Sequence, residues 1–168
     1  MKKIVLMMML IVASLFANEW QEAKVKYVID GDTLMLQKGT SKPFKVRLIA
    51  LDTFENKFNH RVFGQLEILK NVHPMNKKNT VKKVIALGFK AQEYVSARYL
   101  HKTVKYHAYG YDKYNRLLVW IEVLNFSLIR QGWAVYYPNN QISKERKAYL
   151  LKLSRDANVN HRGIYARY

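Results

Sequence analysis

The chain has 168 residues and a formal charge of +17, because 29 basic side chains face only 12 acidic ones. Such a basic protein is expected to bind polyanions, and nucleic acid, lipopolysaccharide headgroups and anionic membranes all qualify. Cysteine is absent, which excludes a fold held together by disulfides and leaves packing to stabilise it.

The first seventeen residues predict an export signal. Two lysines precede an apolar run from Ile4 to Phe16, and the small residue Ala17 ends it. This layout is typical of a signal peptide (residues 1–17), and the run is too short for a permanent membrane span. An uncleaved N-terminal anchor is the alternative, because Leu15 is larger than cleavage sites prefer. We expect an exported protein, periplasmic or secreted, in which residues 18–168 form one domain of roughly 150 residues.

Three β-strands are predicted in the first third of the chain. Apolar side chains alternate along residues 24–29, form a run at 33–36 and alternate again along 44–49. In the third strand Phe44, Val46 and Leu48 share one face, so Arg47 lies on the opposite face.

Acidic side chains concentrate around these strands. Asp30, Asp32, Asp52 and Glu55 lie within 27 residues, in a chain with few acids elsewhere. Carboxylates crowded in this way repel one another unless a cation, a metal ion or a raised pKa relieves them. Hard cations such as Ca²⁺ take carboxylate and carbonyl oxygens, which Asp32, Asp52 and the main chain of Thr53 can supply.

The first acidic turn also has a simpler interpretation. Asp30-Gly31 between two apolar runs is typical of a β-hairpin, in which the glycine adopts a positive φ. A hairpin explains neither Arg47, five residues before Asp52, nor Glu55 in the second acidic turn. Arg47 and Glu55 are therefore candidate site residues together with the carboxylates.

A basic insertion, residues 56–86, follows the second acidic turn, and in it seven cationic side chains face one acid, Glu67. The pattern predicts a short helix at 64–69 and a break at His73-Pro74. Long excursions of this kind are functional or disordered more often than not. One interpretation is a lid or a guide for a polyanion, and the other is a charged segment that is merely solvated.

The second half of the chain predicts a helix at 88–101, strands at 103–109 and 117–121, and two closing helices. Asn125 and Ser143 are the expected N-caps of the closing helices. The turn 112–116 carries Lys113 and Arg116, whose long side chains either reach a neighbouring site or face solvent. This order of elements favours a five-stranded OB-fold barrel with about three helices, an α+β fold.

Seven short motifs follow one another along the chain: 29–33 (IDGDT), 44–48 (FKVRL), 52–55 (DTFE), 112–116 (DKYNR), 130–132 (RQG), 137–140 (YPNN) and 162–165 (RGIY). In their order and approximate spacing the chain resembles the thermonuclease (staphylococcal nuclease) family, from about residue 25 to residue 165. The resemblance implies a Ca²⁺-dependent endonuclease, a phosphodiesterase that acts on DNA and RNA, on an OB-fold barrel.

The same resemblance implies a role for each matching residue. It implies that a metal-bound water attacks phosphorus with Glu55 as base, while Arg47 and Arg116 stabilise the charge on the phosphate. The implied metal ligands are Asp32, Asp52 and the carbonyl of Thr53. The residues implied to lie beside the nucleotide are Lys113, Tyr114 and either Tyr136 or Tyr137.

Two departures and two rival interpretations accompany this resemblance. Phe54 stands where the family usually has proline, so the second acidic turn is expected to be looser. The insertion after Glu55 is also longer than in the best-known members. A noncatalytic nucleic-acid-binding OB-fold module is the main rival, although all six candidate polar positions are present, and a basic cell-envelope protein is the other. We expect a monomer with no obligate protein partner.

Overall fold

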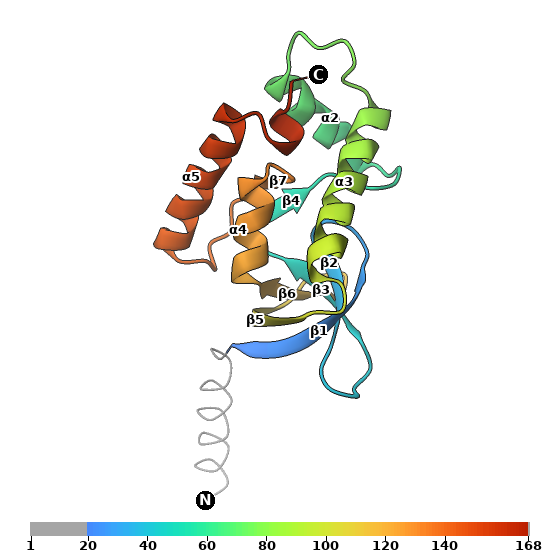
Figure 1. Cartoon of the computed structure of the whole chain (residues 1–168), viewed down its shortest axis with the longest axis vertical. Helices are drawn as coiled ribbons and strands as arrows, with labels where there is room; N and C mark the ends of the chain where they lie inside the picture. Colours follow the sequence, from blue (N-terminus) through green and yellow to red (C-terminus); the bar gives the residue numbers. More distant parts are fainter. Residues whose placement is uncertain (1–19, 168) are drawn as a thin grey trace, which may run out of the picture.

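Five strands close into a barrel in the computed structural model, which describes residues 20–167 (Figure 1). Around the barrel they are β1 (Gln21–Val28), β2 (Thr33–Gln37), β3 (Phe44–Leu48), β6 (Leu117–Trp120) and β5 (Thr103–Tyr111). Neighbours pair antiparallel except β3 and β6, which are parallel. The predicted five-stranded barrel is confirmed, whereas the predicted signal peptide lies outside the described residues.

Alternating apolar side chains fill the barrel, as the sequence pattern predicts for strands with one buried face. Burying each large one stabilises the fold by about 1.5–3 kcal/mol relative to leaving it in water. The buried strand residues include Val25, Leu34, Leu36, Val46, Leu48, Tyr106, Val119 and Trp120. The barrel is therefore a packed core, and any site has to lie on its outside.

A second, smaller layer of structure extends the barrel at one end (Figure 1). Its two short strands, β4 (Leu51–Thr53) and β7 (Ala134–Tyr136), pair antiparallel. The helices of this layer are α2 (Arg61–Val72), α3 (Val81–Tyr99), α4 (Glu122–Arg130) and α5 (Lys144–Val159), followed by the short 3-10 turn η1 (Gly163–Tyr165). β4 carries Asp52, so this small sheet positions one of the candidate carboxylates.

The basic insertion is more ordered than the sequence pattern predicts. Its first helix, α2, is twelve residues long and not a short turn at 64–69, and α3 begins at Val81, seven residues before the predicted start. Thr80 caps α3, because its side chain accepts a hydrogen bond from the backbone of Lys83. The helices α2 and α3 pack through a small second core, so this part of the insertion is part of the fold.

Phe54 belongs to that second core and corrects the expectation of a loose turn. Its ring is 2% exposed and packs among Val62, Leu69, Val84, Leu87 and Ile164. A buried aromatic anchor thus holds the turn in which the family usually has a proline. The turn is fixed by packing and not by a restricted φ.

Of the two predicted helix caps, one is confirmed and the other is wrong. Ser143 caps α5 by accepting a hydrogen bond from the backbone of Arg146, as expected. Asn125 lies inside α4 instead of capping it, because the helix starts at Glu122. Its buried amide accepts from the backbone of Ile121 and donates to the carbonyl of Ile49, 2.9 and 2.8 Å away, tying α4 to the end of β3.

Within residues 20–167, no helix has the length and apolar character needed to cross a membrane.

Candidate active site

The two acidic turns meet at Arg47. This arginine lies on β3 and donates through one guanidinium nitrogen to Asp32 Oδ1 and through the other to Asp52 Oδ1, the latter at 2.6 Å. The backbone N–H of Thr53 also donates to Asp32 Oδ2, at 3.0 Å. Residues that lie 21 apart in the sequence are thereby joined directly, and the two carboxylates share one positive group.

Two glycines allow this close approach. A Cβ added at Gly31 would lie 2.8 Å from the Thr53 side chain, and one added at Gly88 on α3 would lie 2.3 Å from the carbonyl oxygen of Glu55. The expected hairpin is present, because β1 and β2 pair antiparallel across this turn, but Gly31 is not among the residues with positive φ, which corrects that part of the expectation. Glycine is required here because the second acidic turn packs against it.

The electrostatics of the site follow from burial. Asp32 and Asp52 are almost fully buried, 2% and 8% exposed, and are paired with the guanidinium of Arg47. Burial lowers the pKa of Arg47, but the charges of Asp32 and Asp52 outweigh it and leave the pKa raised. Burial, followed by the charge of Asp32, raises the pKa of Asp30 to about 7. The site therefore holds more negative charge than Arg47 alone can balance.

Helix α2 and the loop before it supply three further side chains, which the sequence prediction missed. Arg61 donates to Glu55 Oε1 at 2.6 Å and also to Asp52, and Asn59 donates to Glu55 Oε2 at 2.7 Å. Gln65, 3% exposed, accepts from the backbone of Glu55 and donates to the carbonyl of Thr53, at 2.7 and 3.0 Å.

A signal for two of these residues is present in the sequence. Arg61 and Gln65 are four residues apart, so both face the site once the helix begins at Arg61. The predicted helix began at Gly64 and left Arg61 in the charged segment. This error in the helix boundary separated Arg61 from Gln65, which lies inside the predicted helix, so their shared face did not appear in the prediction.

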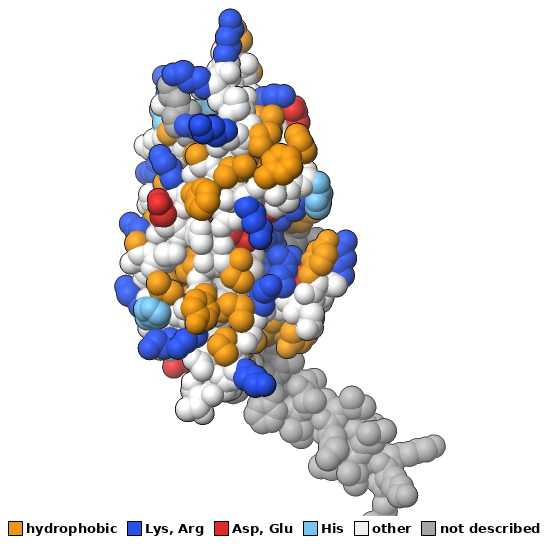
Figure 2. Space-filling model, turned by 90° about the vertical axis from the view of Figure 1, so that its right-hand side faces the viewer, with side chains coloured by type: hydrophobic (Ala, Val, Ile, Leu, Met, Phe, Trp, Pro, Cys, Tyr) orange, Lys and Arg blue, Asp and Glu red, His pale blue; other side chains and the backbone are white. Residues whose placement is uncertain are grey.

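A groove of about 630 Å³ runs along this part of the molecule, and both acidic and basic side chains line it. Arg47, Asp52, Arg61 and Arg116 are among the lining residues. The face shown in Figure 2 is hollowed at mid-height, where basic and acidic side chains meet. The groove thus combines one buried carboxylate, that of Asp52, with three arginines.

Arg116 reaches the groove from the turn between β5 and β6. Asp112 orients it by accepting from Nε at 2.8 Å and from Nη2 at 2.7 Å. The exposed ring of Tyr114 lies between two cations, 5.1 Å from Lys113 Nζ and 5.4 Å from the Arg116 guanidinium carbon. Lys113 is exposed beside this ring. The turn therefore presents one oriented guanidinium and one exposed aromatic side chain.

The structure separates the two candidate tyrosines at the end of β7. Tyr137 is 63% exposed and lines the groove with Asn139. Tyr136 packs against the barrel core, and its hydroxyl is buried without a hydrogen-bond partner in the described part of the chain. Of the two, Tyr137 is the residue positioned to contact a ligand in the groove.

The oxygen donors of the site are of the kind that a divalent cation binds. No three acidic or histidine side chains among residues 20–167 form a group that could hold a metal ion. The predicted set instead consists of two carboxylates and the Thr53 carbonyl, which are the hard oxygen donors that Ca²⁺ prefers. Both carboxylates contact one guanidinium, so they lie close enough to share a cation. The residues therefore fit Ca²⁺, although arginine and Gln65 donors occupy these oxygens in the structure.

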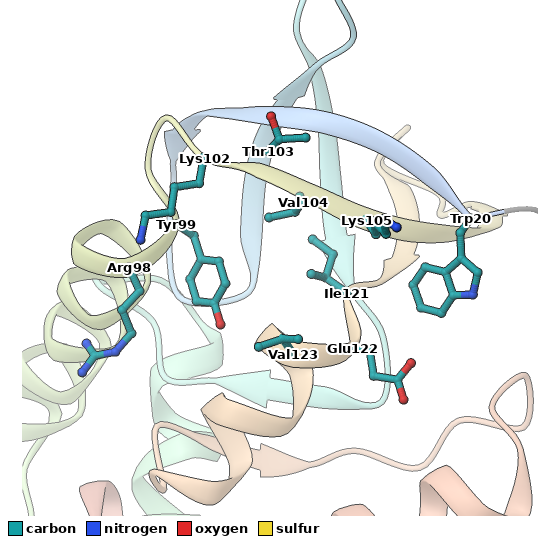
Figure 3. A pocket seen from close by; sticks show the side chains of 10 residues that line it. All are labelled: Trp20, Arg98, Tyr99, Lys102, Thr103, Val104, Lys105, Ile121, Glu122 and Val123. Carbon is teal, nitrogen blue, oxygen red and sulfur yellow. The ribbon is translucent and has the colours of Figure 1, made fainter.

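A larger groove of about 860 Å³ lies between the end of α3, the start of β5 and the start of α4 (Figure 3). Apolar side chains such as Tyr99, Val104 and Val123 line it, and Trp20 stands at one end. Glu122 is the only acid among the residues that line this second groove. The two grooves have no lining residue in common. Arg98 also lines this second groove, but only the first of the two grooves combines several arginines with a buried carboxylate.

Comparison with known proteins gives a match to a protein family. The profile of the family described as staphylococcal nuclease homologue matches residues 45–167, which is most of the chain. No curated protein matches the chain significantly.

Proposed function

The chain belongs to the staphylococcal nuclease homologue family, and on that premise we propose that it is an exported, Ca²⁺-dependent nuclease that hydrolyses phosphodiester bonds of DNA and RNA. The observation that carries the proposal is the meeting of Asp32 and Asp52 at Arg47, which lines one groove together with Arg116. A binding surface for a polyanion needs the arginines, but it has no need of two buried carboxylates paired with one of them.

The arginines supply the charge stabilisation that phosphodiester hydrolysis requires. Attack on phosphorus builds negative charge on the non-bridging oxygens, and a planar guanidinium can hold two such oxygens with paired hydrogen bonds. Arg47 is oriented by the two acidic turns and Arg116 by Asp112, so neither must be ordered during the reaction. Removing one preorganised donor of this kind costs about 10²–10³ in rate.

The carboxylates divide into two roles. Asp32 and Asp52, with the carbonyl of Thr53, would hold Ca²⁺, which supplies Lewis-acid stabilisation of the developing charge when bound. Glu55 is the proposed base. Its carboxylate accepts a hydrogen bond from Asn59, which suits a residue that must orient one water molecule.

The proposal is tested by incubating plasmid DNA and a structured RNA with the protein in Ca²⁺ or in chelator. We expect both to be cleaved only in Ca²⁺. Retarded migration without cleavage would instead identify a noncatalytic nucleic-acid-binding module. If the protein neither cleaves nor retards the nucleic acid, the basic envelope protein is the remaining interpretation.

The variant Arg47→Lys, in the same assay, separates the positive charge of Arg47 from its ability to hold two phosphate oxygens. Lysine keeps the charge but cannot hold two oxygens, so we expect cleavage to fall by about 10²–10³. Arg98→Lys, at an exposed position on α3, is the matched control and should cleave normally. Near-normal cleavage by Arg47→Lys would remove Arg47 from the mechanism.

Export is the part of the proposal that rests on residues 1–17 alone. The mature protein recovered from the periplasm or medium is expected to begin at Asn18. Recovery of the protein in the membrane fraction with Met1 intact would support an uncleaved anchor instead.

A further inference from the structure

Helix α2 delivers a third guanidinium to the candidate site. Arg61 contacts Asp52 through one nitrogen and Glu55 through the other, so it bridges a candidate metal ligand and the candidate base. Burial lowers the pKa of Arg61, but the charge of Asp52 outweighs it, so the side chain stays cationic. A charged group in this position affects whatever else binds the two carboxylates.

One oxygen of Asp52, Oδ1, is fully engaged. Asp52 Oδ1 accepts from both Arg47, at 2.6 Å, and Arg61, at 2.5 Å, while Oδ2 accepts from Gln65 at 3.2 Å. A carboxylate oxygen has two lone pairs, so Oδ1 has no capacity for a metal ion while both arginines contact it. A cation that binds Asp52 through Oδ1 must therefore displace one of them.

Of the two arginines on Asp52 Oδ1, Arg61 is the one that a cation can displace. Its side chain is 38% exposed, whereas that of Arg47 is 15% exposed and is also held by Asp32. Both line the groove with Arg116, so a released Arg61 remains within the space where a phosphate would lie. Long, exposed arginine side chains change rotamer easily, and helix α2 itself need not move.

We propose that Arg61 is a third phosphate-binding arginine, which is stored on Asp52 and Glu55 until a divalent cation takes its place. This inference rests on the proposed function. It makes the cation and the nucleic acid bind cooperatively, because the cation frees Arg61 for phosphate and the phosphate keeps Arg61 away from the carboxylates. Such coupling is reciprocal, so each ligand raises the affinity of the site for the other by the same factor.

A purely structural role for Arg61 predicts the opposite result. If Arg61 only held the second acidic turn in place, its loss would loosen the metal ligands and weaken cation binding. Under the storage role, its loss removes a competitor and strengthens cation binding. The direction of the change in Ca²⁺ affinity therefore separates the two.

The experiment is calorimetric titration of Ca²⁺ into the protein without nucleic acid. We expect Arg61→Gln to bind Ca²⁺ about tenfold more tightly than the wild type, because the cation no longer displaces a charge-assisted hydrogen bond. Arg61→Lys, which keeps the charge but not the two-point contact, should lie between them. The control Lys57→Gln removes an exposed cation from the loop that precedes α2 and should leave the affinity within twofold.

The second measurement is binding of a fluorescent phosphorothioate oligonucleotide in saturating Ca²⁺. Arg61→Gln is expected to bind it about tenfold more weakly than the wild type, since one phosphate contact is lost. Equal or weaker Ca²⁺ binding by Arg61→Gln, or unchanged oligonucleotide binding, would overturn the inference while leaving a wild-type nuclease intact. A wild type that takes up no Ca²⁺ would overturn this inference and the proposed Ca²⁺ dependence together.

Discussion

Gln65 offers the most direct test of how helix α2 supports the site. We consider Gln65→Met, which keeps most of the volume but removes every hydrogen bond of the amide. Two backbone groups of the second acidic turn then lose their partners, the N–H of Glu55 and the carbonyl of Thr53. Leaving a buried polar group unpaired costs about 1–3 kcal/mol, so with the weaker bond to Asp52 we expect about 3 kcal/mol of lost stability.

Urea unfolding in chelator measures this loss without interference from bound cations. For a domain of this size, about 3 kcal/mol corresponds to a fall of about 6–12 °C in Tm. Gln141→Met, at an exposed position, is the matched control and should change stability by less than about 0.5 kcal/mol. A loss below about 1 kcal/mol for Gln65→Met would refute the reasoning, since water would then replace the amide at no cost.

Three other predictions follow from particular contacts. Gly88→Ala places a methyl group 2.3 Å from the carbonyl oxygen of Glu55, so the turn must shift by about 1 Å, and we expect about a 10²-fold lower kcat in a fold of near-normal secondary structure by circular dichroism. Asn125→Ala leaves two buried backbone groups unpaired and should lower the free energy of unfolding, measured in urea, by about 2–4 kcal/mol. A smaller loss would contradict the cost assigned to the two unpaired groups. Hydrogen bonds from the Arg116 backbone and side chain outweigh burial and lower the pKa of Asp112, so this carboxylate stabilises the fold above its ordinary pKa and the benefit is lost as the pH falls through its lower folded value. Asp112→Asn should therefore have a lower Tm than the wild type at pH 7, and a difference that does not shrink below about pH 4 in calorimetry would contradict that assignment.

Several features of the site are local in the sequence and could be read from it. The acidic residues stand in two short turns beside predicted strands, Arg47 follows from strand alternation, and Ser143 is a cap of ordinary type. Each of these depends on neighbours within a few residues, for which side-chain periodicity and capping chemistry are sufficient.

Other features depend on groups far away in the chain. Gly31 and Gly88 are glycines because separate segments press against them, and no local turn rule contains that information. The position of Phe54 in a second core, and of Asn125 inside α4 instead of at its start, also follow from packing against distant residues. In these cases tertiary contacts replaced the local expectation.

The amino-acid sequence by itself determined the barrel, because the alternation of apolar side chains leaves one face of each strand to be buried, and it determined which acids and arginines are available for chemistry. Only the tertiary structure decided that both acidic turns share Arg47 and that the basic insertion returns Arg61 and Gln65 to them. The physical reason is that charge and periodicity are properties of single segments, whereas a buried ion-pair network exists only where packing brings several segments within hydrogen-bonding distance.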